Sequence, residues 1–191
     1  MINFWQEKAK EKGLKGLCIV YQQVFYNHLK EPTGDLFDYG IEYQPGYVVH
    51  RMQRTNLRVI KSKILHEIVH SLHLPQTLVS TIHYSYDEVW KNILKIIPKD
   101  NKMIPGAYVN WDNTPRYKSG ASVHVGFSVD KFERYLSEQI RRAKDVYHKD
   151  MIFMFAWNEW GEGGYLEPDK KYESSVLEAI RNALAKNGEL P

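Results

Sequence analysis

The sequence predicts an α/β domain in which parallel β-strands alternate with α-helices. Short runs rich in β-branched and aromatic residues are followed by polar loops, and most of these loops lead into a segment with the 3.6-residue period of a half-buried helix. One run, residues 151–157 (MIFMFAW), is apolar at every position, as expected for a strand covered on both faces. This alternation is typical of βαβ units and a parallel sheet.

The predicted strands are residues 16–20, 78–84, 106–111 and 151–157. The predicted helices are residues 3–12, ended by Gly13, and residues 56–73, 129–147 and 173–186. About four βα units are too few for a closed eight-stranded barrel, which takes about 250 residues. An open doubly wound sheet is the alternative, but no strand is followed by the Gly-rich phosphate loop of that fold. The helix at 56–73 carries its apolar stripe on Leu57, Ile60, Ile64, Ile68 and Leu72.

The composition indicates one domain of ordinary size with a substantial core. The chain has 191 residues, of which 43% are hydrophobic and 13% aromatic, and aromatic rings serve equally as core and as platforms for sugars. The net charge of +3 is spread along the chain, so the sequence gives no sign of a nucleic-acid partner. The single cysteine, Cys18, excludes an internal disulfide framework and is expected to pack as a small core residue.

No segment predicts contact with a membrane. No run reaches the ~18 apolar residues that a membrane-spanning helix needs. The first 13 residues, MINFWQEKAKEKG, lack the apolar region of a secretory signal. The cytoplasm is therefore the expected compartment.

The most informative segment is residues 157–169 (WNEWGEGGYLEPD), which begins where an apolar strand ends. In a parallel βα architecture the loops at the carboxyl ends of strands carry the active site. Two carboxylates three residues apart, Glu159 and Glu162, suit glycoside chemistry, in which one acid is protonated and the other ionised. Aromatic neighbours would raise the pKa of one of the pair. The alternative is a solvated acidic turn. The expected sugar-binding residues here are Trp157, Asn158, Trp160 and Tyr165.

A second segment, residues 105–117 (PGAYVNWDNTPRY), also lies at a strand end. Trp111 and Tyr117 could stack on a sugar, while Asp112, Asn113 and Arg116 offer acceptors and donors for hydroxyl groups. The alternative is structural, because Asp-Asn-Thr-Pro is strong turn chemistry and Arg116 could be an ordinary ion-pair partner. We expect both segments to line one cleft. Residues 21–25 and 83–87 follow other strands and either line the same cleft or are ordinary loops, and residues 42–45 are either a substrate loop or a structural segment.

Residues 66–70 (HEIVH) match the zincin pattern of two histidines one helical turn apart. At about 100° per residue, however, His66, His70 and His73 fall opposite the apolar stripe and should face solvent. The downstream pattern of a metzincin is also missing, because residue 76 is Gln. We therefore expect no metal here, and no cofactor elsewhere.

Residues 156–169 (AWNEWGEGGYLEPD) closely resemble the signature of WbsX-type glycosyltransferases, a group also described as similar to glycoside hydrolase family 99. Residues 111–116 (WDNTPR) resemble a second motif of this group, and residues 39–45 (YGIEYQP) and 84–90 (YSYDEVW) resemble two weaker ones. The resemblance covers nearly the whole chain. It implies a (β/α)₈ barrel and a role in bacterial O-antigen or capsule polysaccharide synthesis.

The resemblance also implies roles for individual residues. In family 99 hydrolases the motif reads Trp-Asn-Glu-Trp-His-Glu, and both glutamates are catalytic. Glu159 would then be the base that deprotonates a sugar 2-hydroxyl, giving an anhydrosugar intermediate, and Glu162 the general acid and then base. Gly161 replaces the histidine, so the contact that the histidine makes is missing here.

The N-terminal half of the family domain has no counterpart in this sequence. We therefore expect the C-terminal half of a barrel as a single partial domain over residues 1–191, from a truncated gene, a split gene or a fragment. The first hypothesis is an enzyme that transfers or hydrolyses glycans. The alternative is a non-catalytic half-barrel that binds sugar or is a remnant. Exposed sheet edges predict a homo-oligomer or a partner that supplies the missing half.

Overall fold

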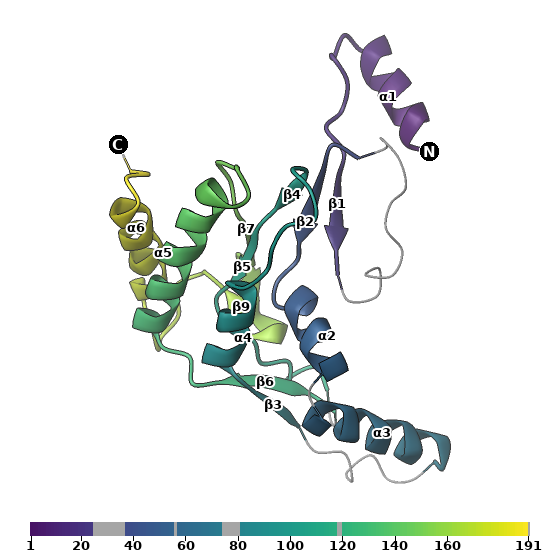
Figure 1. Ribbon diagram of the computed structural model, residues 1–191, viewed down its shortest axis with the longest axis vertical. Coiled ribbons are helices and arrows are strands. Elements are labelled where there is room, and N and C mark those ends of the chain that lie inside the picture. The colour runs from purple at the N-terminus through teal and green to yellow at the C-terminus, as the bar shows by residue number, and fades with distance from the viewer. Residues whose placement is uncertain (25–36, 56, 74–80, 118–119, 191) are drawn as a thin grey trace.

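A computed structural model describes residues 1–24, 37–55, 57–73, 81–117 and 120–190 (Figure 1). Its main sheet is parallel. β1 (Val20–Gln23) pairs with β2 (Tyr39–Glu42), and β2 pairs with β4 (Met103–Ile104). After Pro105 the same segment continues as β5 (Gly106–Tyr108), which pairs with β7 (Phe153–Phe155). The strands are thus arranged side by side in chain order, as successive βα units require.

A second pair of strands lies beside this sheet. β3 (Ile82–Ser85) runs parallel to β6 (Ser122–Val125), and an antiparallel bridge joins Asp112 to Val123. The bridge ties the loop after β5 to β6. This pair therefore holds one side of the loop that contains the WDNTPR motif.

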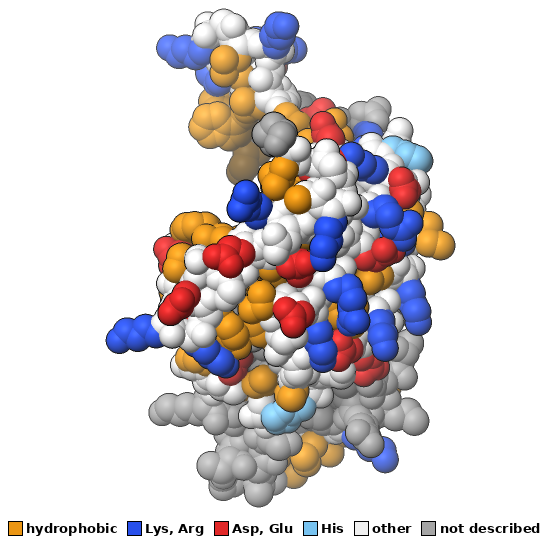
Figure 2. All heavy atoms as spheres, turned by 90° about the vertical axis from the view of Figure 1, so that its left-hand side faces the viewer, with side chains coloured by type: hydrophobic (Ala, Val, Ile, Leu, Met, Phe, Trp, Pro, Cys, Tyr) orange, Lys and Arg blue, Asp and Glu red, His pale blue; other side chains and the backbone are white. Residues whose placement is uncertain are grey.

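Six helices complete the described fold (Figure 1). α5 packs along α6 at one side of the molecule, while α2 and α4 pack against each other nearer the sheets. Figure 2 shows acidic and basic side chains interspersed over the face turned to the viewer. Exposed ion pairs of the chain include Arg141 with Glu138. Such exposed pairs stabilise a fold only slightly. The helices are α1 (Ile2–Glu11), α2 (Gly46–Thr55), α3 (Leu57–Ser71), α4 (Tyr86–Ile93), α5 (Val129–Asp145) and α6 (Ser175–Lys186).

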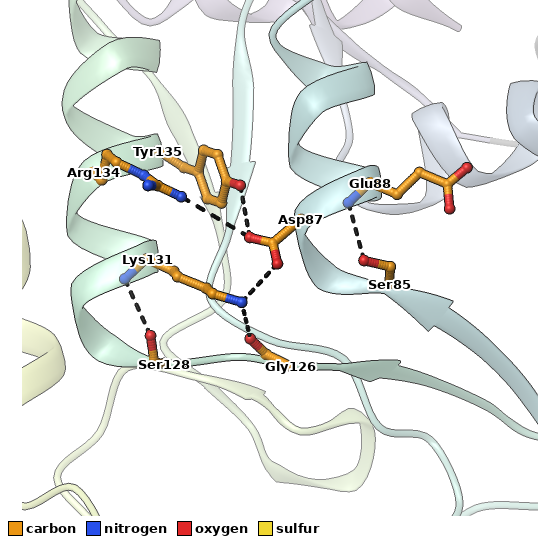
Figure 3. A network of polar contacts seen from close by, with 8 residues as sticks. All are labelled: Ser85, Asp87, Glu88, Gly126, Ser128, Lys131, Arg134 and Tyr135. Carbon is orange, nitrogen blue, oxygen red and sulfur yellow. Dashed lines mark hydrogen bonds and ion pairs between the residues drawn. The ribbon is translucent and has the colours of Figure 1, made fainter.

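The starts of α4 and α5 are joined by a polar network (Figure 3). The side chain of Ser85 caps α4, and that of Ser128 caps α5 by accepting from the backbone N–H of Lys131 at 3.3 Å. Asp87 accepts from Lys131 at 2.6 Å and from Tyr135 at 2.7 Å, which lowers the pKa of its carboxyl group. Asp87, which the sequence left as a cleft or loop residue, is therefore engaged in holding two helices together.

The core lies between the helices and the sheet and is built around Trp90 of α4. The indole of Trp90 stacks on Tyr108 with 5.4 Å between ring centroids, and on Tyr135 with 5.6 Å. The hydroxyl of Tyr86 donates to the backbone carbonyl of Val109 across 2.8 Å. These rings anchor β5, and with it the loop that follows.

The parallel α/β class is confirmed, and so are the four predicted helices to within a few residues. The strand predicted at residues 16–20 was placed too early in the chain, because β1 begins only at Val20. Cys18 is exposed and not in the core. The part of the strand predicted before residue 81 lies outside the described residues. Unforeseen elements are β2, β4, β6, α2 and α4, all of them short.

The described strands do not close into a barrel: β1 is an outer strand of the sheet β1–β2–β4, and β7 pairs only with β5 among the described strands. On β7, Met154 lines the space between α5 and α6, while Phe153 and Phe155 share the opposite face, since alternate side chains of a strand point the same way. Phe155 is 6% exposed but Phe153 is 43% exposed. Met151 and Trp157 are also exposed, so the expectation that residues 151–157 are covered on both faces is wrong for this face except at Phe155.

The apolar stripe predicted for the helix at 56–73 is also not buried. Ile64, Ile68 and Leu72 are 54%, 46% and 62% exposed, whereas Val69 is 2% exposed. α3 contacts mainly α2 and projects from the body of the molecule (Figure 1), and among its side chains whose burial is described Val69 is the buried one. The side chains of His66 and His70 lie outside the described residues.

Candidate active site

The segment after β7 folds into a tight antiparallel hairpin. A cis peptide bond joins Phe155 to Ala156, and β8 (Asn158–Glu159) then pairs with β9 (Gly164–Tyr165). A 3₁₀ turn, η3 (Trp160–Glu162), connects the two strands. A Cβ atom at Gly164 would lie 2.2 Å from Cε1 of Phe155, so only glycine permits this approach. The hairpin therefore holds Glu159 and Glu162 at the carboxyl end of β7.

The loop after β5 lies directly against this hairpin. The backbone N–H of Asp112 donates to the carbonyl of Glu162 across 2.8 Å. Gly163 adopts a left-handed conformation (φ 62°), and a Cβ atom there would lie 3.0 Å from the backbone nitrogen of Asp112. The two motifs, some fifty residues apart in the chain, are in contact at one end of the sheet.

Arg116 joins the two carboxylates. Its guanidinium donates from Nη2 to Oε1 of Glu159 across 2.5 Å and from Nη1 to Oε1 of Glu162 across 3.0 Å. The side chains of Glu159 and Glu162 are 32% and 18% exposed, so Glu162 is the more enclosed. One fixed cation therefore holds two carboxylates of different burial close together.

Gly161 makes room for Arg116. A Cβ atom at residue 161 would lie 2.7 Å from Nε of Arg116. The space that a side chain at residue 161 would enter is thus taken up by the arginine side chain of another loop.

The pKa of Glu162 is raised, first by burial and also by the nearby charge of Glu159, while Arg116 lowers it. A carboxyl group with a raised pKa retains its proton more readily and can act as a general acid. The pair thus combines a more enclosed acid with a more exposed carboxylate, as cleavage or formation of a glycosidic bond requires.

Tyr43 belongs to this site, although the sequence singled out only the segment around it. The pKa of its hydroxyl is raised by burial and then by the charges of Glu162 and Glu159, which places the phenol near both carboxylates. Its ring packs edge-on against Phe155 at 5.4 Å. It lies directly after β2 (Tyr39–Glu42), and the resemblance of residues 39–45 to a motif of the WbsX-type group was the available sequence signal.

Three residues of the WDNTPR motif hold the loop itself. The indole Nε1 of Trp111 donates to Oγ of Ser122 across 2.8 Å. The carboxylate of Asp112 accepts from the backbone N–H of Thr114 at 3.0 Å, and the side chain of Asn113 accepts from the N–H of Ser122 at 2.7 Å. The turn chemistry seen in the sequence is therefore present alongside the site.

The remaining aromatic candidates border the hairpin. Trp160 stacks on Tyr165 with 3.8 Å between ring centroids, and its Nε1 donates to Glu167 across 2.6 Å. Trp157, Trp160 and Tyr117 are 55%, 47% and 53% exposed, and Asn158 is exposed as well. Exposed rings of this kind are available to stack on a sugar.

No cluster of three or more metal-ligating side chains occurs within the described part of the chain. Helices long and apolar enough to cross a membrane are likewise absent from the described residues.

The model of a protein family described as Glycosyltransferase WbsX matches residues 1–180. The chain belongs to this family. The resemblance of its motifs is thereby confirmed, and the hairpin and the Arg116 loop lie within the matched residues.

Among curated proteins, the chain is similar to a protein described as uncharacterized protein WxcX in two strains of Xanthomonas campestris pv. campestris. The identity is 23% over 184 residues in both. The aligned region covers 95% of this chain but only 24% of WxcX, so the chain spans about a quarter of the length of these relatives. No solved structure matches the chain.

Proposed function

We propose that this domain acts on glycans, by glycosyl transfer or glycoside hydrolysis, with Glu159 and Glu162 as its reacting carboxylates. The observation that carries the proposal is the pair of contacts from Arg116 to both carboxylates. Membership of a glycosyltransferase family supports the glycan as substrate. Synthesis or processing of a bacterial surface polysaccharide fits this chemistry.

In this proposal Glu162 donates a proton to the oxygen of the departing sugar, because its pKa is raised and its side chain is the more enclosed. Glu159, which makes the shorter contact with Arg116, accepts a proton from the attacking hydroxyl group. That hydroxyl belongs to water, to an acceptor sugar, or to C2 of the same sugar. Trp157 and Trp160 lie exposed beside the pair and offer faces for stacking on the glycan.

The parallel strands in chain order support a partial (β/α)₈ barrel as the setting of this site. Among the described strands β7 pairs only with β5, and Phe153 is left uncovered on the face opposite α5 and α6. Strands of a neighbouring segment would cover that face in a complete barrel. The second candidate, a sugar-binding module without catalysis, is favoured by the exposed Trp157 and the stacked Trp160 and Tyr165.

The test is an assay of the chain with a panel of oligosaccharides and glycosides, with products identified by mass spectrometry. Glu162→Gln and Glu159→Gln should each abolish turnover while leaving the circular dichroism spectrum unchanged. Glu178→Gln, on an exposed carboxylate of α6, is the matched control and should retain activity. Turnover that survives both site substitutions would overturn the assignment. Binding of glycans without turnover in any variant would favour the binding module.

A further inference from the structure

A cavity of about 300 Å³ is lined by Trp111, whose neighbour Asp112 contacts the backbone of Glu162. It is enclosed by the first two turns of α2 on one side and by the loop after β5 and strand β6 on the other. Its volume is at the lower end of the range typical of small-molecule sites, about 300–1,000 Å³. None of the interactions assigned so far to Glu159 and Glu162 uses this space.

The aromatic wall of the cavity is fixed in place. Nε1 of Trp111 donates to Ser122, and the carbonyl of Trp111 accepts from the backbone N–H of His124 across 2.8 Å. The indole also packs against Phe155, with 5.6 Å between ring centroids. A ring held at two points on a backbone that is itself anchored is a rigid surface that loses little conformational entropy when a ligand stacks on it.

The other walls combine polar and short apolar side chains. His50, Gln53 and His124 line the cavity together with short apolar groups, and no Asp, Glu, Lys or Arg does so among the described residues. Burial lowers the pKa of His124 to about 3, so its imidazole is neutral at physiological pH. An indole wall with a few polar side chains suits the uncharged, hydroxylated ring of a sugar. A phosphate or a uronate would instead require a cation.

The two loops that line the cavity also pack against the hairpin that carries Glu159 and Glu162. In the loop after β5, Trp111 lines the cavity and the next residue, Asp112, bonds to the backbone of Glu162. In the loop after β2, Tyr43 lies near both carboxylates and Pro45 lines the cavity. A chain of linked sugars could therefore lie across Trp111, with one unit in the cavity and the next at the carboxylates.

We propose that this cavity is a subsite for one neutral sugar ring of the glycan, adjacent to the unit that reacts at Glu159 and Glu162. The subsite rests on the proposed function for the identity of its ligand. It makes the glycan at least two units long and requires an uncharged sugar in one of them.

Gly46 provides a direct way to block the cavity. It lines the wall, and a Cβ atom built on it meets nothing within 4 Å, so a side chain there has space and no steric conflict. Gly46→Phe should fill the cavity, whereas Gly46→Ala, at the same position, should leave most of it open. The two variants form a matched pair that differs only in the volume added.

The experiment is a titration of the 191-residue chain with methyl α-glucoside, methyl α-mannoside and methyl α-galactoside, followed by the indole N–H resonance of Trp111, which is assigned with Trp111→Phe. At least one of these glycosides should shift the resonance. Gly46→Ala should bind it within about twofold of the unmodified chain, and Gly46→Phe at least about tenfold more weakly. Glucuronate and glucose 1-phosphate should bind more weakly than the neutral glycosides.

The outcomes separate this subsite from the proposed function. If Gly46→Phe weakens glycoside binding but the chain shows no turnover, the subsite is supported and the proposed reaction alone is contradicted. If turnover depends on Glu162 but no neutral glycoside shifts the indole N–H resonance of Trp111, the subsite is overturned and the proposed reaction is supported. Tighter binding of glucuronate or glucose 1-phosphate also overturns it. If Gly46→Phe fails to fold, the shift of Trp111 in the unmodified chain remains decisive.

Discussion

The guanidinium of Arg116 lies 3.0 Å from the carboxylate of Glu162, and that cation opposes the rise in the pKa of Glu162 caused by burial and by Glu159. The balance of these three influences determines how readily Glu162 keeps a proton. A change at residue 116 should therefore be measurable at residue 162 even without a substrate.

Replacing Arg116 by Ala should raise the pKa of Glu162 further, because only the lowering influence is removed. The protonated form of Glu162 would then persist to higher pH. Carbon-13 NMR titration of the glutamate carboxyl groups measures this directly. Arg134→Ala, which removes a cation 4.0 Å from Asp87, is the control and should leave Glu162 unchanged. An unchanged or lower pKa in Arg116→Ala would contradict the assigned contact.

A methyl group at residue 161 should displace Arg116, since a Cβ atom there would lie 2.7 Å from Nε. Displacing a reacting or positioning group by ~1 Å can reduce the rate by about 10²-fold, so Gly161→Ala should lower kcat/KM by roughly 10- to 100-fold. The free energy of unfolding should change by less than about 1 kcal/mol, because ion pairs this exposed stabilise little.

A double-mutant cycle separates this steric effect from a general disturbance of the hairpin. In an Arg116→Ala background the side chain that Gly161→Ala would displace is absent, so the second substitution should have little further effect on kcat/KM. Additive losses in the double variant would show that residue 161 acts independently of Arg116.

The buried carboxyl group of Glu42 should make stability depend on pH. Glu42 is fully buried and accepts from the hydroxyl of Tyr147 at 2.8 Å, and burial raises its pKa to about 7. The folded chain therefore keeps a proton that the unfolded chain loses near pH 4.5. Because the folded state binds more protons in this interval, the free energy of unfolding falls as pH rises from about 4.5 to 7.

Glu42→Gln cannot ionise and should escape this loss. The difference in free energy of unfolding, variant minus unmodified chain, should become more positive by about 3 kcal/mol between pH 4 and pH 8. Urea unfolding at several pH values measures it, and taking the difference at each pH cancels the titration of His124 and other shared groups. Glu178→Gln, at an exposed position, should give a flat difference. A flat difference for Glu42→Gln would contradict the raised pKa.

The uncovered end of β7 should make the chain associate. Phe153 is 43% exposed at an edge strand, and exposed apolar edges invite pairing with another chain. Light scattering should detect dimers or larger species, and Phe153→Ser should reduce them without lowering stability. Phe155 lies two residues along on the same face but is only 6% exposed. Phe155→Ser should therefore lower the free energy of unfolding by about 3–5 kcal/mol. A monomer at high concentration would contradict the expectation.

The sequence predicted the long helices because their apolar periodicity is strong, and it predicted β5 and β7 because their composition is distinctive. It missed β2 (Tyr39–Glu42) and α4 (Tyr86–Ile93), which are too short for periodicity to be seen. It also took the stripe of Ile64, Ile68 and Leu72 to be buried. Periodicity reports which face of a helix is apolar, but whether that face is covered depends on distant packing.

The sequence predicted the individual residues of the candidate site but not the contacts between them. Glu159, Glu162 and Arg116 were each singled out, but Arg116 was expected to bind substrate, and in the structure it contacts both glutamates. Tyr43 was missed as an individual residue, because its place near the carboxylates depends on how the loops after β2 and β7 converge. Such a convergence follows from the register of a parallel sheet, which no local pattern contains.

The close approach of Gly161 and Arg116 has a consequence for how this family can diverge. A side chain at residue 161 and an extended arginine at residue 116 compete for one volume, so neither position can change freely while the other is kept. Family members with a larger residue at the position of Gly161 should lack the arginine at the position of Arg116 or hold its side chain in another conformation. The two positions are therefore expected to covary, so that the residue at 161 indicates which cation, if any, holds the two glutamates.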